Sequence, residues 1–171
     1  MAYFLILAAA ILRFLPHLPN FAPITAMALF GGAYLNKKFA FLVPIAAMVV
    51  SDYFIGFDSL ESRAIVYGSF MLSGGIGLWI KNHKSIANIV GGTLLSSVLF
   101  YLVTNFAFFY PPTMYSHDLS VVIASYINAL PFFRGTLLGD FFYVGVTFGS
   151  YELAVYLKAR KKAFDKTQKL V

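Results

Sequence analysis

Six apolar runs set the strongest limit on what this chain can fold into. They cover residues 2–15, 22–35, 39–56, 64–80, 86–110 and 133–157. The last four are long enough to cross a hydrocarbon core of about 30 Å, which takes roughly 20 helical residues. The first two are short, so they are either thin spans or the two arms of a re-entrant pair. Because lipid cannot satisfy open backbone groups and no barrel-like alternation is present, the runs predict an all-α integral membrane protein with a six-helix transmembrane bundle.

The composition also favours a membrane protein. Hydrophobic residues make up 60% of the chain and charged residues 12%, whereas soluble domains average about 45–50% and 25%. Cysteine is absent, which excludes disulfides and thiolate ligands. The start, MAYFLILAAAILRF, lacks the basic region of a signal peptide, so we expect a retained first segment. We expect one domain over 1–157 and a basic tail over 158–171.

The lysines and arginines predict an orientation. With six spans, ten of the thirteen basic residues fall on the side that carries both termini. These ten are Lys37, Lys38, Lys81, Lys84, Lys158, Arg160, Lys161, Lys162, Lys166 and Lys169. The positive-inside rule makes that side cytoplasmic, which predicts a protein of the bacterial inner membrane with both termini in the cytoplasm. The tail is then an orientation determinant near anionic headgroups of the lipid bilayer rather than a partner-binding surface. No nucleic acid partner is expected.

Most of the unusual polar residues fall in the outer half of this topology. Asp52 lies at the outer end of the third run, Asn105 in the outer third of the fifth, and Asp140 in the sixth. Asp140 is about 10 Å deep at 1.5 Å per residue. An aspartate inside a span costs about 2.5–3.5 kcal/mol, so Asp140 requires a partner or a wet cavity. One alternative is an ion pair with Arg134 or Arg13 that only locks helices together.

Two polar stripes predict the walls of a pocket. The sixth run carries Thr136, Asp140, Tyr143 and Thr147 on one helix face. The fifth run carries Ser97, Tyr101, Thr104 and Asn105. On neighbouring helices, the two stripes would enclose one pocket that opens to the outer side.

The connection RFLPHLPNFAP, residues 13–23, gathers further polar groups on the same side. Its three prolines fix φ, which would hold His17 and Asn20 over the pocket. Arg13 would serve as a helix-end anchor or as a contact for an anion. The alternative is a loop that only reverses the direction of the chain.

Two other features concern packing. The long outer connection after Tyr110 contains DLSVVIASYINAL, which we expect to form a short separate helix ended by Pro131. GTLLG at 135–139 and GVTFG at 145–149 are GxxxG motifs, which allow close helix approach. We expect packing within the chain rather than dimerisation.

Several of these segments resemble those of a known family. They are RFLPHLPNFAPITAMALFGGAYL, PIAAMVVSDYFIG, FYLVTNFAFF and PFFRGTLLGDFFYVGVTFG. They are similar to segments of an uncharacterised family of small bacterial membrane proteins that carry only a provisional transport label. That family is in turn similar to the substrate-binding S-components of energy-coupling factor (ECF) vitamin transporters. The resemblance implies an S-component fold, an outward pocket and an energising transmembrane subunit with ATPases. S-components often dock through AxxxA on the first helix, which LAAAIL at 7–12 lacks, so solitary operation is a second expectation.

The expected function is therefore capture of a small, partly aromatic nutrient, vitamin-like or a cofactor precursor, through an outward-facing pocket, followed by its import. Asp140, Asn105 and Asp52 would orient the polar atoms of the ligand, while Tyr101, Tyr143 and Phe108 would pack against its ring. No GxxxxGK[ST] motif is present, so ATP use would come from another chain. We expect no cofactor.

Three other functions remain open. A metal-ion carrier would use His17, His117, Asp52 and Asp118, although no HxxxH spacing occurs. A membrane enzyme would pair His17 with Asp52 or Asp140 as base and orienter, but we expect no enzyme because no serine elbow or metalloprotease helix is present. A non-catalytic assembly subunit would use Asp140 for stability or complex formation.

Overall fold

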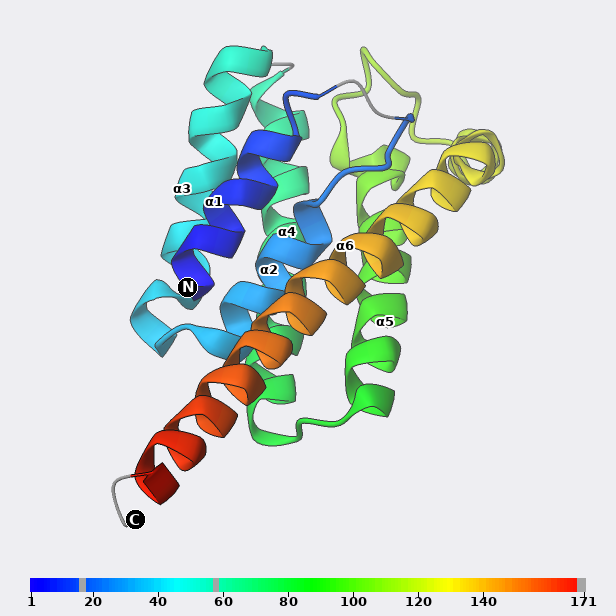
Figure 1. Ribbon diagram of the computed structural model, residues 1–171. Helices are drawn as coiled ribbons and strands as arrows, with labels where there is room; N and C mark the ends of the chain where they lie inside the picture. Colours follow the sequence, from blue (N-terminus) through cyan, green and yellow to red (C-terminus); the bar gives the residue numbers. More distant parts are fainter. Residues whose placement is uncertain (16–17, 57–58, 169–171) are drawn as a thin grey trace.

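The computed structural model describes residues 1–15, 18–56 and 59–168, and these residues form helices and connections without a strand. The helices are α1 (Ala2–Leu12), α2 (Ile24–Tyr34), α3 (Lys37–Ile55), α4 (Leu60–Asn82), α5 (Ile86–Thr104) and α6 (Leu119–Gln168), with a 3-10 turn, η1, at Ala107–Phe109 (Figure 1). The predicted all-helical class is confirmed.

Four helices are long and apolar enough to cross a membrane: α3, α4, α5 and α6. The other two, α1 and α2, have 11 residues each, or about 16 Å at 1.5 Å per residue. They run in opposite directions on either side of the connection 13–23 (Figure 1). Each is therefore only about half as long as a 30 Å hydrocarbon core is thick.

The connections gather at two ends of the bundle. We call one the loop end; it carries the C-terminal ends of α1, α3 and α5, the N-terminal ends of α2 and α4, and the connection 105–118 (Figure 1). We call the opposite one the lysine end; it carries the α2–α3 and α4–α5 connections. There the Lys81 Nζ donates to the Leu35 carbonyl oxygen at 2.6 Å, and Lys84 forms an ion pair with Glu152. Lys81 and Lys84, two of the basic residues predicted to share one side, thus connect helices at this end.

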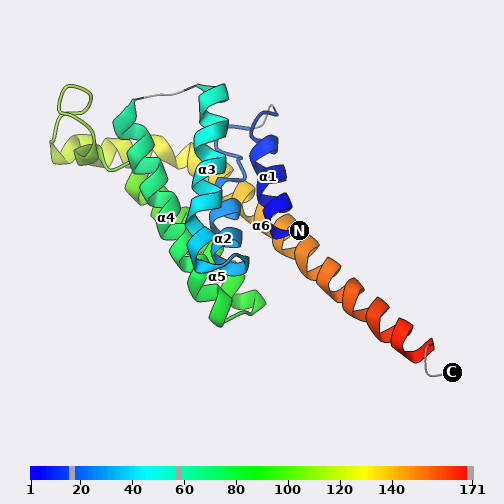
Figure 2. The same cartoon turned by 90° about the vertical axis from the view of Figure 1, so that its left-hand side faces the viewer.

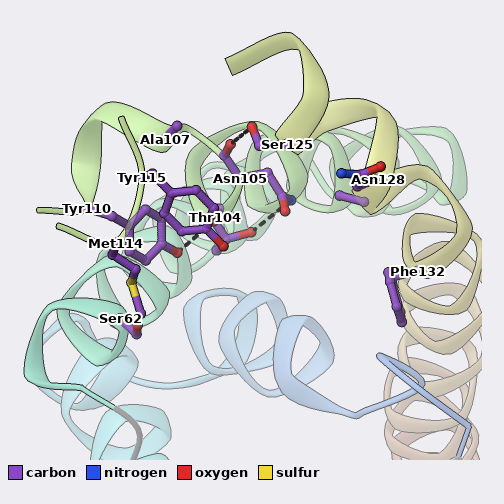
Figure 3. Close-up of a pocket in the computed structure, with 11 residues that line it drawn as sticks. Ser62, Thr104, Asn105, Ala107, Tyr110, Met114, Tyr115, Ser125, Asn128 and Phe132 are labelled. Carbon is purple, nitrogen blue, oxygen red and sulfur yellow. Dashed lines mark hydrogen bonds between the residues drawn. The ribbon is translucent and has the colours of Figure 1, made fainter. Parts of the chain in front are cut away.

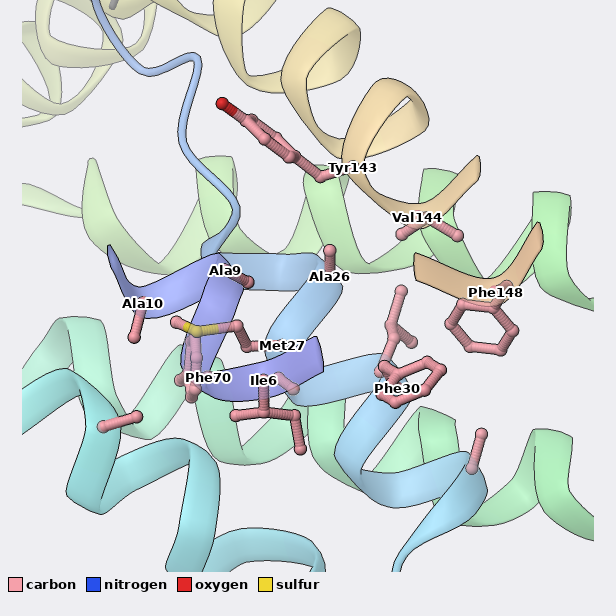
Figure 4. Close-up of a cluster of buried hydrophobic side chains, with 14 of the residues drawn as sticks. Ile6, Ala9, Ala10, Ala26, Met27, Phe30, Phe70, Tyr143, Val144 and Phe148 are labelled. Carbon is pink, nitrogen blue, oxygen red and sulfur yellow. The ribbon is translucent and has the colours of Figure 1, made fainter. Parts of the chain in front are cut away.

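The centre of the bundle is α2, which contacts each of the other α-helices. All its residues from Thr25 to Ala33 are buried, as suits a helix that is apolar all round. A Cβ at Gly32 would lie 2.3 Å from the Gly74 carbonyl oxygen, so the backbones of α2 and α4 touch. Met27 and Phe30 of α2 pack with side chains of α1, α4 and α6 in the core (Figure 4).

The last helix, α6, differs from the prediction. It continues through Pro131, so the expected separate helix ended by that proline is wrong. Proline removes one backbone hydrogen bond and bends a helix rather than always ending it. The helix changes direction in this region: in Figure 1 its yellow part is seen end-on while its orange part crosses the view. Residues 158–168 continue α6 away from the bundle (Figure 2).

Candidate functional site

Three adjoining cavities run from the loop end towards Asp140. We call them the outer, middle and inner cavities, with volumes of about 380, 300 and 220 Å³. The outer and middle cavities share Thr104, Asn105, Ala129 and Phe132 as lining residues. The middle and inner cavities share Asn20, Phe100 and Thr136. Because consecutive cavities share walls, they form one series along α5 and α6, and Asn20 of the connection 13–23 borders the middle and inner cavities.

The outer cavity is lined by amide, hydroxyl and phenol groups (Figure 3). Asn105 Nδ2 donates to the Tyr101 carbonyl oxygen at 2.8 Å, and Ser125 Oγ donates to the Asn105 carbonyl oxygen at 2.7 Å. Tyr110 Oη donates to the Thr104 carbonyl oxygen at 2.7 Å. Burial, with Tyr115 nearby, raises the pKa of Tyr110 above its ordinary value, so its phenol remains a neutral donor. These bonds hold the outer wall together.

The middle cavity has an aromatic wall formed by Phe100, Tyr101, Phe132 and Phe133. The rings of Tyr101 and Phe133 lie 4.6 Å apart between centroids, within the range of attractive ring pairs. Tyr101 Oη donates to the Tyr126 carbonyl oxygen at 2.7 Å and so joins α5 to α6. The phenol thus fixes the helices, while the ring lines the cavity.

The inner cavity contains the carboxyl group of Asp140, which is only 2% exposed. Ser97 Oγ donates to Asp140 Oδ2 at 2.6 Å, and Thr25 and Thr136 line the same cavity. Within the described residues, Asp140 makes no ion pair with a lysine or arginine. The structure therefore gives this carboxyl group hydroxyl partners and a cavity, in place of the helix-locking pair with Arg13 or Arg134.

Arg13 instead pairs with Asp52. Arg13 Nη2 lies 2.6 Å from Asp52 Oδ1, and Arg63 Nη1 lies 3.0 Å from Asp52 Oδ2. Tyr67 Oη also donates to Asp52 Oδ2 at 2.7 Å, and the Ser51 hydroxyl binds Arg13. Asp52 is fully buried and does not line the three cavities. The structure thus places it in a network that joins the end of α1 to α3 and α4, rather than in the lining of these cavities.

The part of the connection over residues 18–23 packs against α6. A Cβ at Gly135 would lie 2.2 Å from the Pro19 carbonyl oxygen, and one at Gly139 would lie 3.0 Å from the Phe21 Cα. Asn20, at φ 58°, lines both the inner and middle cavities; asparagine tolerates this left-handed conformation better than most residues. GTLLG therefore serves packing within the chain, whereas Gly145 and Gly149 face open space.

The remaining predicted site residues lie elsewhere. Tyr143 is buried in the core, with its ring centroid 5.4 Å from that of Phe21. Phe108 stacks on His117 at 4.7 Å between centroids and does not line these cavities. His17 falls outside the described residues.

Several lining residues were missed from the sequence, among them Thr25 and Phe100. Thr25 is a polar residue within the apolar run 22–35, and this contrast could have identified it. Phe100 carries no comparable signal, because 19 phenylalanines are spread over the chain. Among the residues that the structure places, no three His, Cys, Asp or Glu side chains gather in a way that could hold a metal ion.

Comparison with known proteins adds a family. Neither the curated proteins nor the solved structures contain a match, so the similarity to S-components expected from the sequence receives no support from them. One family model covers residues 1–164. The chain belongs to DUF6580, a protein family of unknown function.

Proposed function

We propose that this protein is a six-span substrate-binding protein of the bacterial inner membrane, which captures a small nutrient for import. The observation that carries the proposal is the series of three cavities that begins among loops and ends at the buried Asp140. A concave, partly aromatic site with a few converging polar groups is typical of small-molecule binding. A vitamin-like compound or a cofactor precursor has suitable chemistry.

The proposed orientation puts the lysine end in the cytoplasm, together with both termini. The positive-inside rule supports it, and the outer cavity then opens to the exterior. In the proposed topology α1 and α2 are thin spans that complete a set of six with the four long helices. The bilayer would adapt to their short length by local thinning, which costs fractions of a kcal/mol per Å of mismatch.

The energy for import would come from ATP hydrolysis by a second protein or from an ion gradient. The resemblance to S-components favours an energising transmembrane subunit with ATPases as the partner. However, Ala9 and Ala10 of α1 are buried within the chain, so they are not available as a small-residue docking surface. This burial favours operation without a subunit that docks in that way.

The test is ligand binding by the purified full-length chain. Thermal unfolding in detergent, with panels of vitamins, nucleobases and amino acids, identifies compounds that stabilise the protein, and calorimetry then measures their affinity. A ligand at 100 times its Kd should stabilise the folded state by about 2.7 kcal/mol. Absence of binding by every compound, with the helical fold intact, would refute the proposal.

A variant pair locates the binding site. Thr136 lines both the inner and middle cavities, so Thr136→Phe should fill them and abolish binding. Leu138, two residues away on the same helix, is 64% exposed, so Leu138→Phe should bind the ligand as the parent protein does. Equal binding by both variants would place the site elsewhere.

A further inference from the structure

We infer that the ligand is a small aromatic zwitterion, with its ammonium group at Asp140, its carboxylate at Arg13 and its ring in the middle cavity. This inference rests on the proposed function and specifies the substrate class for the same cavities. It arises from the placement of opposite charges, Arg13 and Asp140, in the lining of one small cavity.

Asp140 supplies the site for a positive group. Its carboxyl group is buried at membrane depth, where an ionised aspartate is costly, and it accepts a hydrogen bond from the Ser97 hydroxyl. A carboxylate has room for about four hydrogen bonds. A ligand ammonium group would satisfy the remaining acceptor sites and offset the charge, as a neutral ligand would not.

Arg13 supplies the site for a negative group. Among the described residues its guanidinium bonds to the Met48 carbonyl oxygen, the Ser51 hydroxyl and Asp52. These bonds use three of the five N–H donors of a guanidinium group. The side chain also lines the inner cavity, and the pair with Asp52 fixes its position. A guanidinium held in this way can bind a carboxylate in defined geometry.

The cavity sizes determine which part of the ligand lies where. The inner cavity, about 220 Å³, is smaller than the roughly 300–1,000 Å³ of drug-sized sites. Because Arg13 and Asp140 line it, the charged head of the ligand lies there. The adjoining middle cavity, with Phe100, Tyr101 and Phe133 in its wall, suits a ring. Asn20 and Thr136 lie in both linings, so they would contact the atoms that join head and ring.

The test uses two sets of compounds in which one charge is removed at a time. The first set is phenylalanine, 2-phenylethylamine and 3-phenylpropanoate; the second is tryptophan, tryptamine and indole-3-propanoate. Calorimetry with the full-length protein in detergent measures each Kd. In at least one set, the zwitterion should bind ten or more times tighter than both of its singly charged analogues.

Variants then assign each charge to its residue. Asp140→Asn should weaken binding of the zwitterion and the amine by ten times or more and leave the acid unaffected. Arg13→Gln should weaken binding of the zwitterion and the acid but not of the amine. Arg63→Gln is the matched control, since Arg63 also pairs with Asp52 but does not line the inner cavity. If Arg13→Gln does not fold, Arg13→Lys replaces it. Lysine keeps the positive charge but lacks the planar guanidinium group, so this variant should also bind the zwitterion and the acid more weakly, by a smaller factor.

Other outcomes separate this inference from the proposed function. An amine that binds as tightly as its zwitterion would refute the role of Arg13, and an acid that does so would refute that of Asp140. If none of the six compounds binds while a vitamin or nucleobase does, the zwitterion inference fails and the proposed function stands. If no compound of any panel binds the folded protein, both fail.

Discussion

Two buried aspartates of this chain have different surroundings. Asp52 is 0% exposed and Asp140 2%, so burial alone does not distinguish them. Asp52 is held by two guanidinium groups and a phenol, whereas Asp140 accepts from a serine hydroxyl and lines a cavity. The first carboxylate has partners of opposite charge and joins helices. The second has room beside it for a molecule that supplies the missing charge.

The connection 13–23 links the two regions. Arg13, at its start, binds Asp52 and also lines the cavity of Asp140. Asn20, further along, lines that cavity and the next one. The ion network around Asp52 therefore holds one wall of the candidate site, although Asp52 itself does not line it. Loss of Asp52, which positions Arg13, should affect both regions, while a change at Asp140 should affect only one.

The largest loss of stability is expected for Asp52→Asn. It would leave Arg13 and Arg63 without the carboxylate they share, and breaking a buried ion pair costs about 3–5 kcal/mol. Titration with SDS in mixed micelles measures the free energy of unfolding. Asp165→Asn, at an exposed position of α6, is the control and should change it by less than about 0.5 kcal/mol. A loss of less than 1 kcal/mol for Asp52→Asn would remove the contrast between the two aspartates.

A smaller loss is expected for Gly135→Ala. The added Cβ would lie 2.2 Å from the Pro19 carbonyl oxygen, so the connection must move, and overpacking of this kind costs about 1–3 kcal/mol. Gly145→Ala is the matched control, because nothing lies within 4 Å of its Cβ position and alanine favours a helix by about 0.5–1 kcal/mol. The same SDS titration compares them. Equal stability of the two variants would show that the close contact between the connection and α6 does not contribute to the stability of the fold.

The sequence predicted the helices of this protein but not the contacts between individual side chains. Apolar runs and lysine positions were sufficient for the helices and for the grouping of their connections, because hydrophobicity and charge act over whole segments. The partner of Arg13 was not predictable, because Asp52 and Asp140 both lie in the outer half of the predicted topology. Only the packing of α1 against α3 decides between them. The prediction that the helix ends at Pro131 failed for a related reason. A proline lowers helix stability locally, but neighbouring contacts decide whether the helix continues.

Asn20 should show a loss of about 1 kcal/mol when replaced by alanine. Its φ of 58° is unfavourable for residues with a Cβ, and asparagine tolerates it better than alanine does. Asn20→Gly should keep the stability, because glycine adopts this conformation readily. Both variants lack the amide that lines the inner and middle cavities. Weaker ligand binding by both, with lower stability only for alanine, would separate the two roles of this residue.

The smallest effect on stability, about 1 kcal/mol or less, is expected for Asp140→Asn. The asparagine carbonyl oxygen can still accept from Ser97, and removal of a charge lowers the cost of placing this segment in lipid. The free energy of unfolding should therefore stay the same or rise slightly, while ligand binding falls. SDS titration and calorimetry on the same preparation measure both quantities.

A different result would assign another role to Asp140. If Asp140→Asn destabilised the protein as much as Asp52→Asn, the carboxylate would serve helix packing, as expected for an assembly subunit. The two aspartates would then have one role in spite of their different partners. Unchanged stability together with lost binding would instead mean that the ligand provides the cationic partner that Asp140 lacks among the described residues.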